Sequence, residues 1–281
     1  MLFYASYINV IILVVIDLHM HSEYSDGTCP IEEILAKAKS LGLSQISITD
    51  HNILEGSIQA KEIADINFII GIELSVGYHG TEVHLLGYFP NGSPTDYKNV
   101  KFIVNSGEAY KKIATMEMIE NLNAMGYDIK INELSEFTKG VINRVHICKA
   151  LMKHNYISSV AEGFEKLIGD DCPAYVERKT VTIEEAVEAI HSDGGIAVIA
   201  HPYEYDTLNI DEFLDDISKI IDGIECYHPS AKTEDTKHLI DIANKYNLRI
   251  TGGSDFHGDN KPNIKMGMMN VDDTYQISII K

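Results

Sequence analysis

Cysteine is scarce in this 281-residue chain, and its copies are scattered. They are Cys29, Cys148, Cys172 and Cys226, and no two of them form a CxxC pair. This spacing argues against a zinc knuckle and against a redox dithiol. We expect reduced, structural thiols, which favours a cytoplasmic protein.

Basic side chains are also few. The chain has 23 lysines and arginines against 42 aspartates and glutamates, which gives a formal net charge of −19. A surface of this charge repels a nucleic-acid backbone, so we expect no long nucleic acid as a partner. A phosphorylated substrate would need a local positive charge, and bound divalent cations are the usual source. Part of the acidic excess is therefore expected to bind metal.

The chain lacks an apolar run of the roughly 20 residues that cross a bilayer. Its most apolar stretch is the first sixteen residues, MLFYASYINVIILVVI. No Lys or Arg precedes Asp17 and no small-residue cleavage site follows, so the stretch does not resemble a signal peptide. We expect no membrane partner, and we interpret the stretch as a buried strand that leads into His19 and His21.

The length and the 45% hydrophobic content suit one large domain that carries an insertion. Short apolar strands alternate with amphipathic helices, which indicates βα units in a parallel sheet with right-handed crossovers. Further strands are expected at residues 45–49, 67–76, 82–89, 196–200, 223–227 and 249–253, and helices at 31–41, 183–192, 210–220 and 233–246. A last apolar stretch at 266–271 completes the pattern. About seven units favour a barrel over an open sheet.

The pattern changes between residues 94 and 179, where helical runs at 109–125 and 145–155 replace the buried strands. We interpret this segment as a helical insertion that forms a lid. It divides the barrel into a first part, residues 1–93, and a second part, residues 180–281.

Histidines and carboxylates gather at the ends of the predicted strands. In chain order they are His19, His21, Asp50, His51, Glu73, His84, His201, His228, Asp255 and His257. The carboxyl ends of the strands form the functional face of parallel α/β folds, so these side chains should converge. His19 and His21 would point the same way on a strand and could share one cation.

Several of these residues also have a purely structural explanation. A lone HxH motif is commonly incidental, Asp50 could cap the following helix, and Asp26 with Gly27 could form only a turn. Glu73 could be a paired carboxylate at a strand end. These explanations do not account for the position of most of the 12 histidines at or just beyond a strand end. We therefore favour a metal site.

The ligand types predict the metal and the reaction. Imidazole and carboxylate without thiolate suit zinc, manganese or iron, and the candidates outnumber the about four to six ligands that one ion uses. Two or three divalent cations are therefore expected. Such ions, about 3.5 to 4 Å apart, lower the pKa of a bridging water and clamp the attacking and leaving oxygens at phosphorus. The predicted chemistry is phosphoester hydrolysis.

Separated motifs of the chain resemble the PHP family, the polymerase and histidinol phosphatase domain. They are HMHSEYSDG at 19–27, ITDH at 48–51, GIELSV at 71–76, EVHLLGYF at 82–89, AHP at 200–202 and GGSDFHG at 252–258. The resemblance extends from about residue 17 to residue 257, with the motifs in the family's order. It implies a distorted (β/α)7 PHP barrel, here with a helical insertion, and a trinuclear metal site.

The resemblance also implies a set of metal ligands. One metal would be held by His19, His21, Glu73 and Asp255, and a second by Asp26, His51 and His257. Glu73 would bridge to a third metal, completed by His84 and His201. Asp26 stands where some members of the family have histidine, a change that keeps a ligand and bears on metal preference.

Within the family, the insertion and the segment NRVHICKAL at 143–151 resemble small phosphoesterases that act on nucleoside 3',5'-bisphosphates or on short RNA 5' ends. The resemblance implies that Arg144 and His146 face the substrate phosphate, and a guanidinium suits bidentate phosphate contact. A solvated arginine at a helix start is the alternative. His228 is a candidate for orienting a ligand, contacting phosphate or donating a proton, against a structural role.

The expected function is hydrolysis of a terminal phosphate monoester of a small nucleotide-type substrate by a metal-activated hydroxide. Three alternatives stay open: a histidinol-phosphate phosphatase, a 5'-3' exoribonuclease on short RNA, and a non-catalytic metal-binding regulatory module. A histidinol-phosphate phosphatase would differ in the lid, and a non-catalytic module would have lost several ligands, which this chain keeps. The oligomeric state stays open.

Overall fold

The computed structural model describes residues 15–137 and 142–269. The predicted start of the opening strand before residue 15, and residues 270–271 of the last apolar stretch, lie outside the described residues. The chain forms two compact units, a barrel unit (Met1–Val100 and Ile183–Lys281) and a helical unit (Lys101–Thr182).

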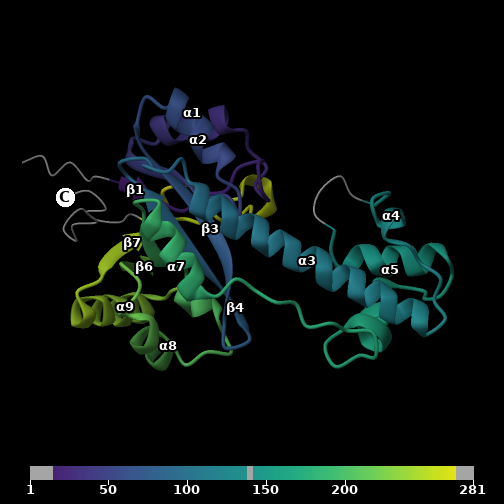
Figure 1. Cartoon of the computed structure of the whole chain (residues 1–281). Helices are drawn as coiled ribbons and strands as arrows, with labels where there is room; N and C mark the ends of the chain where they lie inside the picture. The colour runs from purple at the N-terminus through teal and green to yellow at the C-terminus, as the bar shows by residue number, and fades with distance from the viewer. Residues whose placement is uncertain (1–14, 138–141, 270–281) are drawn as a thin grey trace, which may run out of the picture. The chain divides into compact units, whose positions relative to one another are not determined.

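The barrel unit is built on a seven-stranded sheet in which the strand order follows the chain order. The strands are β1 (Val15–Asp17), β2 (Leu43–Ile48), β3 (Asn67–Tyr78), β4 (Thr81–Phe89), β5 (Ile196–Ile199), β6 (Gly223–Tyr227) and β7 (Arg249–Gly252). The first three strands run parallel, and so do the last three. Figure 1 shows the long β3 and β4 as the centre of this sheet.

β4 differs from the predicted parallel sheet because it pairs antiparallel with both β3 and β5. His79 and Gly80 alone join β3 to β4, and both have positive φ. Two residues can turn an antiparallel hairpin but cannot make the crossover that a parallel pair needs. The prediction of a wholly parallel sheet was wrong at this strand. The reversal places His84 near the start of β4, opposite Ser75 of β3.

Helices cover the outside of the sheet. They are α1 (Ile31–Ser40), α2 (Glu55–Ile63), α7 (Ile183–Ser192), α8 (Ile210–Ile217) and α9 (Thr233–Tyr246). α1 packs on β2, α2 on β2 and β3, α7 on β3 to β5, and α9 on β6 and β7 (Figure 1). In α1 the buried positions are Ile31, Ile34, Leu35 and Ala38, as the helical spacing predicts, and the adjoining glutamates are exposed.

Backbone hydrogen bonds between the segments that follow β1 and β7 close the sheet into a barrel. The amide of Asp255 donates to the His19 carbonyl at 2.8 Å, and the amide of His21 donates to the Phe256 carbonyl at 2.8 Å. Glycine is required at Gly253, because a Cβ there would lie 2.3 Å from the Cβ of His19. Closure therefore places the first and last histidine motifs of the chain side by side.

The interior of the barrel is apolar close to these motifs. One buried cluster contains Ile16, Leu18, Ile69, Leu86, Tyr88, Val198 and Ala200. The hydroxyl of the fully buried Tyr88 donates to the Leu18 carbonyl at 2.9 Å, so the polar end of this ring is satisfied. Water is thus excluded from the barrel next to the strand that leads into His19.

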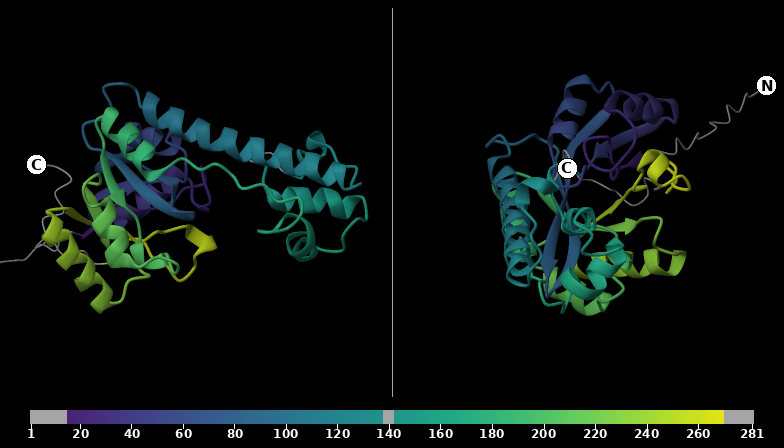
Figure 2. Two further views of the ribbon diagram at one scale, coloured as in Figure 1. Left: turned by 60° about the horizontal axis from the view of Figure 1, so that its bottom comes forward. Right: turned by 90° about the vertical axis from the view of Figure 1, so that its right-hand side faces the viewer.

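The helical unit has a core of its own. α3 (Lys98–Ala124) begins in the barrel unit and is followed by α4 (Ile131–Leu134), α5 (Arg144–Lys153), α6 (Val160–Gly163) and a π-helical turn, η1 (Phe164–Ile168). Figure 2 shows α3 as one long helix with the shorter helices folded against its second half. Apolar residues of α3 and α5, among them Met118, Leu122, Ile147 and Leu151, form this core.

The start of α3 depends on a contact with a distant residue. Asp193, just after α7, accepts hydrogen bonds from the amide of Val100 at 2.8 Å and from the side chain of Asn99 at 2.6 Å. An acceptor at this place satisfies amides that the first turn of a helix leaves unpaired. The helix therefore begins at Lys98 rather than at residue 109, where the apolar spacing becomes helical.

The described part of the chain contains no helix that is long and apolar enough to cross a membrane. All four cysteines are free, and three of them, Cys29, Cys148 and Cys226, are buried. Burial raises the pKa of the Cys148 thiol to about 11. This thiol is therefore protonated at neutral pH and packs as a small apolar group.

Candidate metal centre

All nine predicted ligands lie in the barrel unit, and the structure brings their side chains together. Groups whose ligand atoms lie within 4.8 Å of one another include His21, Asp26, His51 and His257; His19, Glu73 and His201; His19, His21 and Asp255; and His51, Glu73 and His84. The groups draw on the segments after β1, β2, β5 and β7 and on β3 and β4. Residues distant in the chain thus form one cluster, and metal binding by it stays a prediction.

Glu73 lies at the centre of this cluster, and its side chain is 1% exposed. Its Oε1 is 2.8 Å from His84 Nδ1 and 3.0 Å from His201 Nε2. Its Oε2 is 3.2 Å from His19 Nε2 and 3.1 Å from His21 Nε2. A carboxylate whose two oxygens face separate imidazoles is placed to bridge two cations.

Many of these buried atoms lack a hydrogen-bond partner. They are His19 Nε2, His21 Nε2, His51 Nδ1, Glu73 Oε2, His84 Nδ1, His201 Nδ1 and His228 Nε2. Buried polar atoms are normally paired, because each unpaired one costs about 1–3 kcal/mol. Cations bound among them would remove this cost, and imidazole with carboxylate suits zinc, manganese or iron. The residues present therefore fit divalent metal ions.

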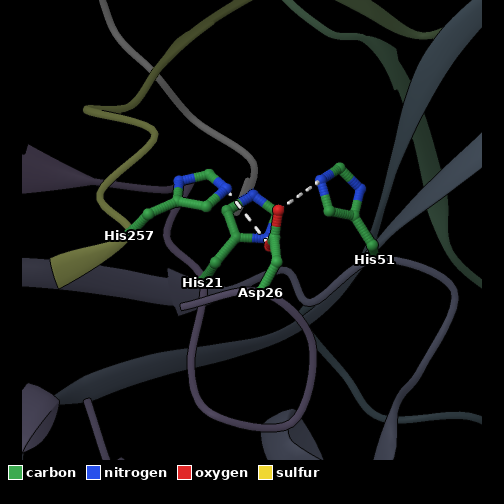
Figure 3. Close-up of side chains that lie close together, drawn as sticks. All are labelled: His21, Asp26, His51 and His257. Atoms are coloured by element: carbon green, nitrogen blue, oxygen red, sulfur yellow. Dashed lines mark ion pairs between the residues drawn. The ribbon is translucent and has the colours of Figure 1, made fainter. Parts of the chain in front are cut away.

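Asp26 joins three imidazoles at one side of the cluster (Figure 3). Its Oδ1 is 3.2 Å from His257 Nε2 and 3.5 Å from His21 Nδ1, and its Oδ2 is 3.8 Å from His51 Nε2. The Asp26 side chain is 55% exposed, so this side of the cluster is open to solvent. A Cβ on Gly27 would lie 2.3 Å from the His21 carbonyl, so the turn at this glycine brings Asp26 to the imidazoles.

Asp50 holds the loop that carries Asp26. Its buried carboxylate accepts hydrogen bonds from the Ser22 amide at 2.8 Å, the Ser22 hydroxyl at 2.6 Å and the Ser25 hydroxyl at 2.6 Å. The alternative in which Asp50 caps the following helix is therefore wrong, since its oxygens serve this loop.

Glu225 in β6 is a residue that sequence analysis missed. It is fully buried; its Oε1 lies 3.0 Å from His19 Nδ1, and its Oε2 accepts from the His201 amide at 2.9 Å. A carboxylate on Nδ1 orients the ring and leaves Nε2 of His19 to face Glu73. The available signal was a charged residue inside the apolar strand GIECY, three positions before His228.

His228 also lies at the cluster. It is 2% exposed, its Nε2 is 3.5 Å from Asp255 Oδ2, and its Nδ1 is 2.7 Å from the Ser230 hydroxyl. It forms a further group with His19 and Glu225. The structure places His228 where it can orient a ligand or hold a proton, and these roles stay predictions.

Two candidate ligands have a backbone conformation that L-residues rarely adopt. His201 has φ 25° and ψ 63°, and Asp255 has φ 55°. Such positions cost about 1–3 kcal/mol and persist where surrounding contacts hold them. His201 also precedes Pro202, which normally favours an extended conformation. Its hydrogen bond to Glu225 holds this conformation and keeps the imidazole against Glu73.

The cluster shifts the pKa values of its imidazoles in opposite directions. Burial lowers the pKa of His21, but the carboxylates of Asp255 and Glu73 outweigh burial and raise it to about 9. Burial likewise opposes the carboxylates around His19, and its pKa is also raised well above the ordinary value. Burial lowers the pKa of His51 to about 4. At neutral pH a cation therefore has to displace protons from His19 and His21 but none from His51.

Arg144 and His146 lie on the first turn of α5 in the helical unit. The Arg144 guanidinium forms an ion pair with Asp170 at 2.9 Å and lies over two aromatic rings. His146 is 8% exposed, and its Nδ1 accepts a hydrogen bond from the Asn143 amide at 3.0 Å, which caps the helix. Both residues thus have partners inside the helical unit, and phosphate contact stays a prediction for each.

The fold and the site define the class of protein: a barrel hydrolase with a cluster of imidazoles and carboxylates suited to several cations. The profile of the PHP domain matches residues 17–191. The chain therefore belongs to the PHP domain family.

Three curated relatives are each 28% identical to this chain, in alignments that cover 86% of its length. They are a 5'-3' exoribonuclease of Haemophilus influenzae, a phosphoribosyl 1,2-cyclic phosphate 1,2-diphosphodiesterase of Eggerthella lenta and a 3',5'-nucleoside bisphosphate phosphatase of Chromobacterium violaceum. The matches cover 89%, 94% and 87% of these proteins, respectively.

A solved structure of a proposed metal-dependent phosphoesterase from Bifidobacterium adolescentis is also similar. It is 25% identical, with a TM-score of 0.66 and 93% coverage of both chains. The predicted family and the predicted barrel with a helical insertion are confirmed. The protein is a metal-dependent phosphoesterase, a hydrolase of phosphoric esters.

Proposed function

We propose that this protein removes a terminal phosphate from a small nucleotide-type substrate, such as a nucleoside 3',5'-bisphosphate, with two or three divalent cations. The observation that carries the proposal is the set of buried nitrogen and oxygen atoms around Glu73 that have no hydrogen-bond partner. The Chromobacterium violaceum relative is a phosphatase of such bisphosphates, which supports this substrate class.

The distances support a division of the ligands among three positions. The first would be held by His19, His21, Glu73 and Asp255, the second by Asp26, His51 and His257, and the third by Glu73, His84 and His201. His21 lies between the first two, because its Nε2 is 3.1 Å from Glu73 and its Nδ1 is 3.5 Å from Asp26. A neutral imidazole offers one lone pair, so His21 would bind the first cation through Nε2 while its Nδ1 faces Asp26.

The protein's own side chains prepare the reaction. Bound cations would lower the pKa of a water molecule and neutralise charge on the phosphate oxygens. Glu225 keeps the His19 ring oriented, and the exposed side of the cluster at Asp26 leaves room for a phosphate to enter. His228 Nε2, 3.5 Å from Asp255, is available to hold a proton for the leaving alcohol.

We further propose that the helical unit acts as a lid and that Arg144 and His146 contact the phosphate. The Arg144 side chain is 38% exposed and is oriented by Asp170, which supports bidentate recognition of an anion. The net charge of −19 argues against a long RNA. The free, buried thiols support a cytoplasmic location.

The test compares phosphate release by protein that has been stripped with a chelator and reloaded with Mn²⁺. The substrates are a nucleoside 3',5'-bisphosphate, a nucleoside 5'-monophosphate, histidinol phosphate and a short RNA with a 5' phosphate. We expect the highest kcat/KM for the bisphosphate. Faster release of mononucleotides from the RNA would instead indicate an exoribonuclease, and release from none of the substrates would contradict the proposal.

A pair of histidine variants controls this test. His51→Ala should remove phosphate release while circular dichroism shows a folded protein. The matched control is His79→Asn, which changes a histidine of the same unit whose side chain is 77% exposed. Asparagine is chosen because His79 has φ 45°, a conformation that asparagine tolerates. Equal phosphate release by the two variants would show that the cluster takes no part in the reaction.

A further inference from the structure

Lys261 brings an ammonium group to the candidate metal centre, although nothing in its sequence neighbourhood singles it out. It follows η3 (Gly258–Asn260), and its Nζ forms an ion pair with Asp255 Oδ2 at 2.5 Å. The side chain of Asp255 is 7% exposed and that of Lys261 is 41% exposed. The lysine therefore approaches the cluster from the solvent side, where a substrate would enter.

The two oxygens of Asp255 have different neighbours. Oδ1 lies among candidate metal ligands, 3.3 Å from His21 Nε2 and 3.6 Å from His19 Nε2. Oδ2 lies against Lys261 and is 3.5 Å from His228 Nε2. One oxygen is thus placed to bind a cation while the other keeps the ammonium group at the edge of the centre.

The backbone that leads to Lys261 is fixed by the loop that carries Asp26. The Asn260 side chain donates to the Asp26 carbonyl at 2.7 Å, and the Asp259 amide donates to the Thr28 hydroxyl at 2.8 Å. An ordinary surface lysine is held only through its own flexible side chain. Here the backbone contacts set the distance between Lys261 and the cluster.

We propose that Lys261 is a further substrate-binding residue, whose ammonium group pairs with a nonbridging oxygen of the phosphate monoester at the metal centre. The inference rests on the proposed function, since that function places a phosphate at the cluster. An ammonium group carries three donors, so one can remain on Asp255 Oδ2 while the others bind phosphate. The ligand class is a dianionic phosphate, which such a compact charge attracts in an otherwise acidic protein.

A purely structural role for Lys261 has a different signature. An ion pair with a partly exposed partner contributes little to fold stability. If Lys261 acted only by orienting Asp255, its loss would weaken Mn²⁺ binding, and phosphate binding would fall only as a result. Separate titrations of metal and phosphate therefore distinguish the two roles.

The experiment uses isothermal titration of inorganic phosphate into the full-length, Mn²⁺-loaded protein, and of Mn²⁺ into the chelator-treated protein. The variants are Lys261→Met, Lys261→Arg and the matched control Lys265→Met. Lys265 is exposed in the same segment, and its Nζ donates to the Pro262 carbonyl at 2.7 Å. Steady-state kinetics on the best monoester substrate add KM and kcat.

Lys261→Met should weaken phosphate binding about tenfold or more, because a hydrogen bond to a charged group is lost. KM should rise by a similar factor with a smaller change in kcat, and Mn²⁺ affinity should stay within about twofold. Lys261→Arg should keep most of the phosphate affinity, and Lys265→Met should match the wild type.

Three results would overturn the proposal: unchanged phosphate binding in Lys261→Met, a loss of phosphate binding matched by an equal loss of Mn²⁺ affinity, or no phosphate binding by the Mn²⁺-loaded wild type. Failure of the proposed function looks different, because the wild type would then release no phosphate from any monoester. The phosphate titration would still decide the role of Lys261 in that case.

Discussion

The barrel unit and the helical unit bury different kinds of side chain. Within the described residues, the helical unit buries two polar side chains, Thr115 and His146, and both have hydrogen-bond partners. The barrel unit buries many histidines and carboxylates, and several of their atoms have no such partner. Well-satisfied packing marks a structural core, whereas concentrated unpaired polar atoms mark a place built for a ligand.

The largest effect in this comparison is expected from Glu73→Gln. The substitution removes the charge shared by imidazoles from several strands, so phosphate release by Mn²⁺-loaded protein should fall by about 1,000-fold or more. Elemental analysis should show less bound manganese per chain.

The matched control for Glu73→Gln lies in the helical unit. A Glu133 oxygen lies 2.7 Å from His154, as a Glu73 oxygen lies 2.8 Å from His84, so Glu133→Gln makes the same chemical change in the other unit. It should leave manganese content and phosphate release unchanged. Similar losses in both variants would show that the contrast between the units has no functional meaning.

A cavity in the helical core should separate stability from metal binding. Leu151 is fully buried in α5, and Leu151→Ala should lower the free energy of unfolding of the helical unit by about 2–5 kcal/mol. Urea denaturation measures this loss, and titration with Mn²⁺ should show unchanged affinity. Leu86 is fully buried in the barrel, so Leu86→Ala should lower the free energy of unfolding of the barrel unit and also the Mn²⁺ affinity. Loss of Mn²⁺ binding in Leu151→Ala would contradict the assignment of metal binding to the barrel unit alone.

Glu225→Gln tests the contact between the Glu225 carboxylate and Nδ1 of His19. The amide side chain keeps the volume but loses the charge beside Nδ1, so Mn²⁺ affinity should fall about 10–100-fold. Glu212→Gln, an exposed position on α8, is the control and should bind Mn²⁺ as the wild type does. An unchanged affinity in Glu225→Gln would assign Glu225 to packing alone.

The smallest single step, about tenfold per pH unit, is expected from the pH dependence of metal binding. The pKa of His21 is about 9, so at neutral pH its proton has to leave when a cation binds, whereas His51, with a pKa of about 4, has none to lose. Apparent Mn²⁺ affinity should fall about tenfold per pH unit, for each displaced proton, as the pH is lowered below about 9. Above this pH the His21 contribution should level off.

Titrations in buffers of different ionisation enthalpy count the protons released on binding. At least one proton per chain is expected at pH 7 from His21. Mn²⁺ binding without proton release at pH 7 would show that His21 is not a metal ligand.

Much of the fold could be predicted because local apolar spacing reports a single buried face. The helix Ile183–Ser192, the strand Gly223–Tyr227 and the helix Thr233–Tyr246 have the bounds expected from sequence. The direction of β4 and the start of α3 were not predicted. Both are set by partners outside the local pattern, the antiparallel neighbours of β4 and the carboxylate of Asp193.

The candidate site was predictable to the extent that strand ends share one face. That rule predicted the convergence of His19, His201 and Asp255 without knowledge of any distance, whereas Glu73 lies in the middle of β3 rather than at its end. The rule could not find Glu225. A carboxylate inside an apolar strand has the same sequence pattern whether it orients a metal-binding histidine or forms an ion pair that only stabilises the fold. The rule could not find Lys261, because the contacts that hold its loop come from residues near position 26.

The closure of the barrel between residues 18–21 and 252–256 has a consequence for protein synthesis. The earliest histidines leave the ribosome long before Asp255 and His257. Until then β1 has an unpaired edge and the first ligand set lacks its last member. We expect nascent chains that end before Gly253 to bind cations weakly, so that metal is loaded only after the segment 253–257 has been synthesised.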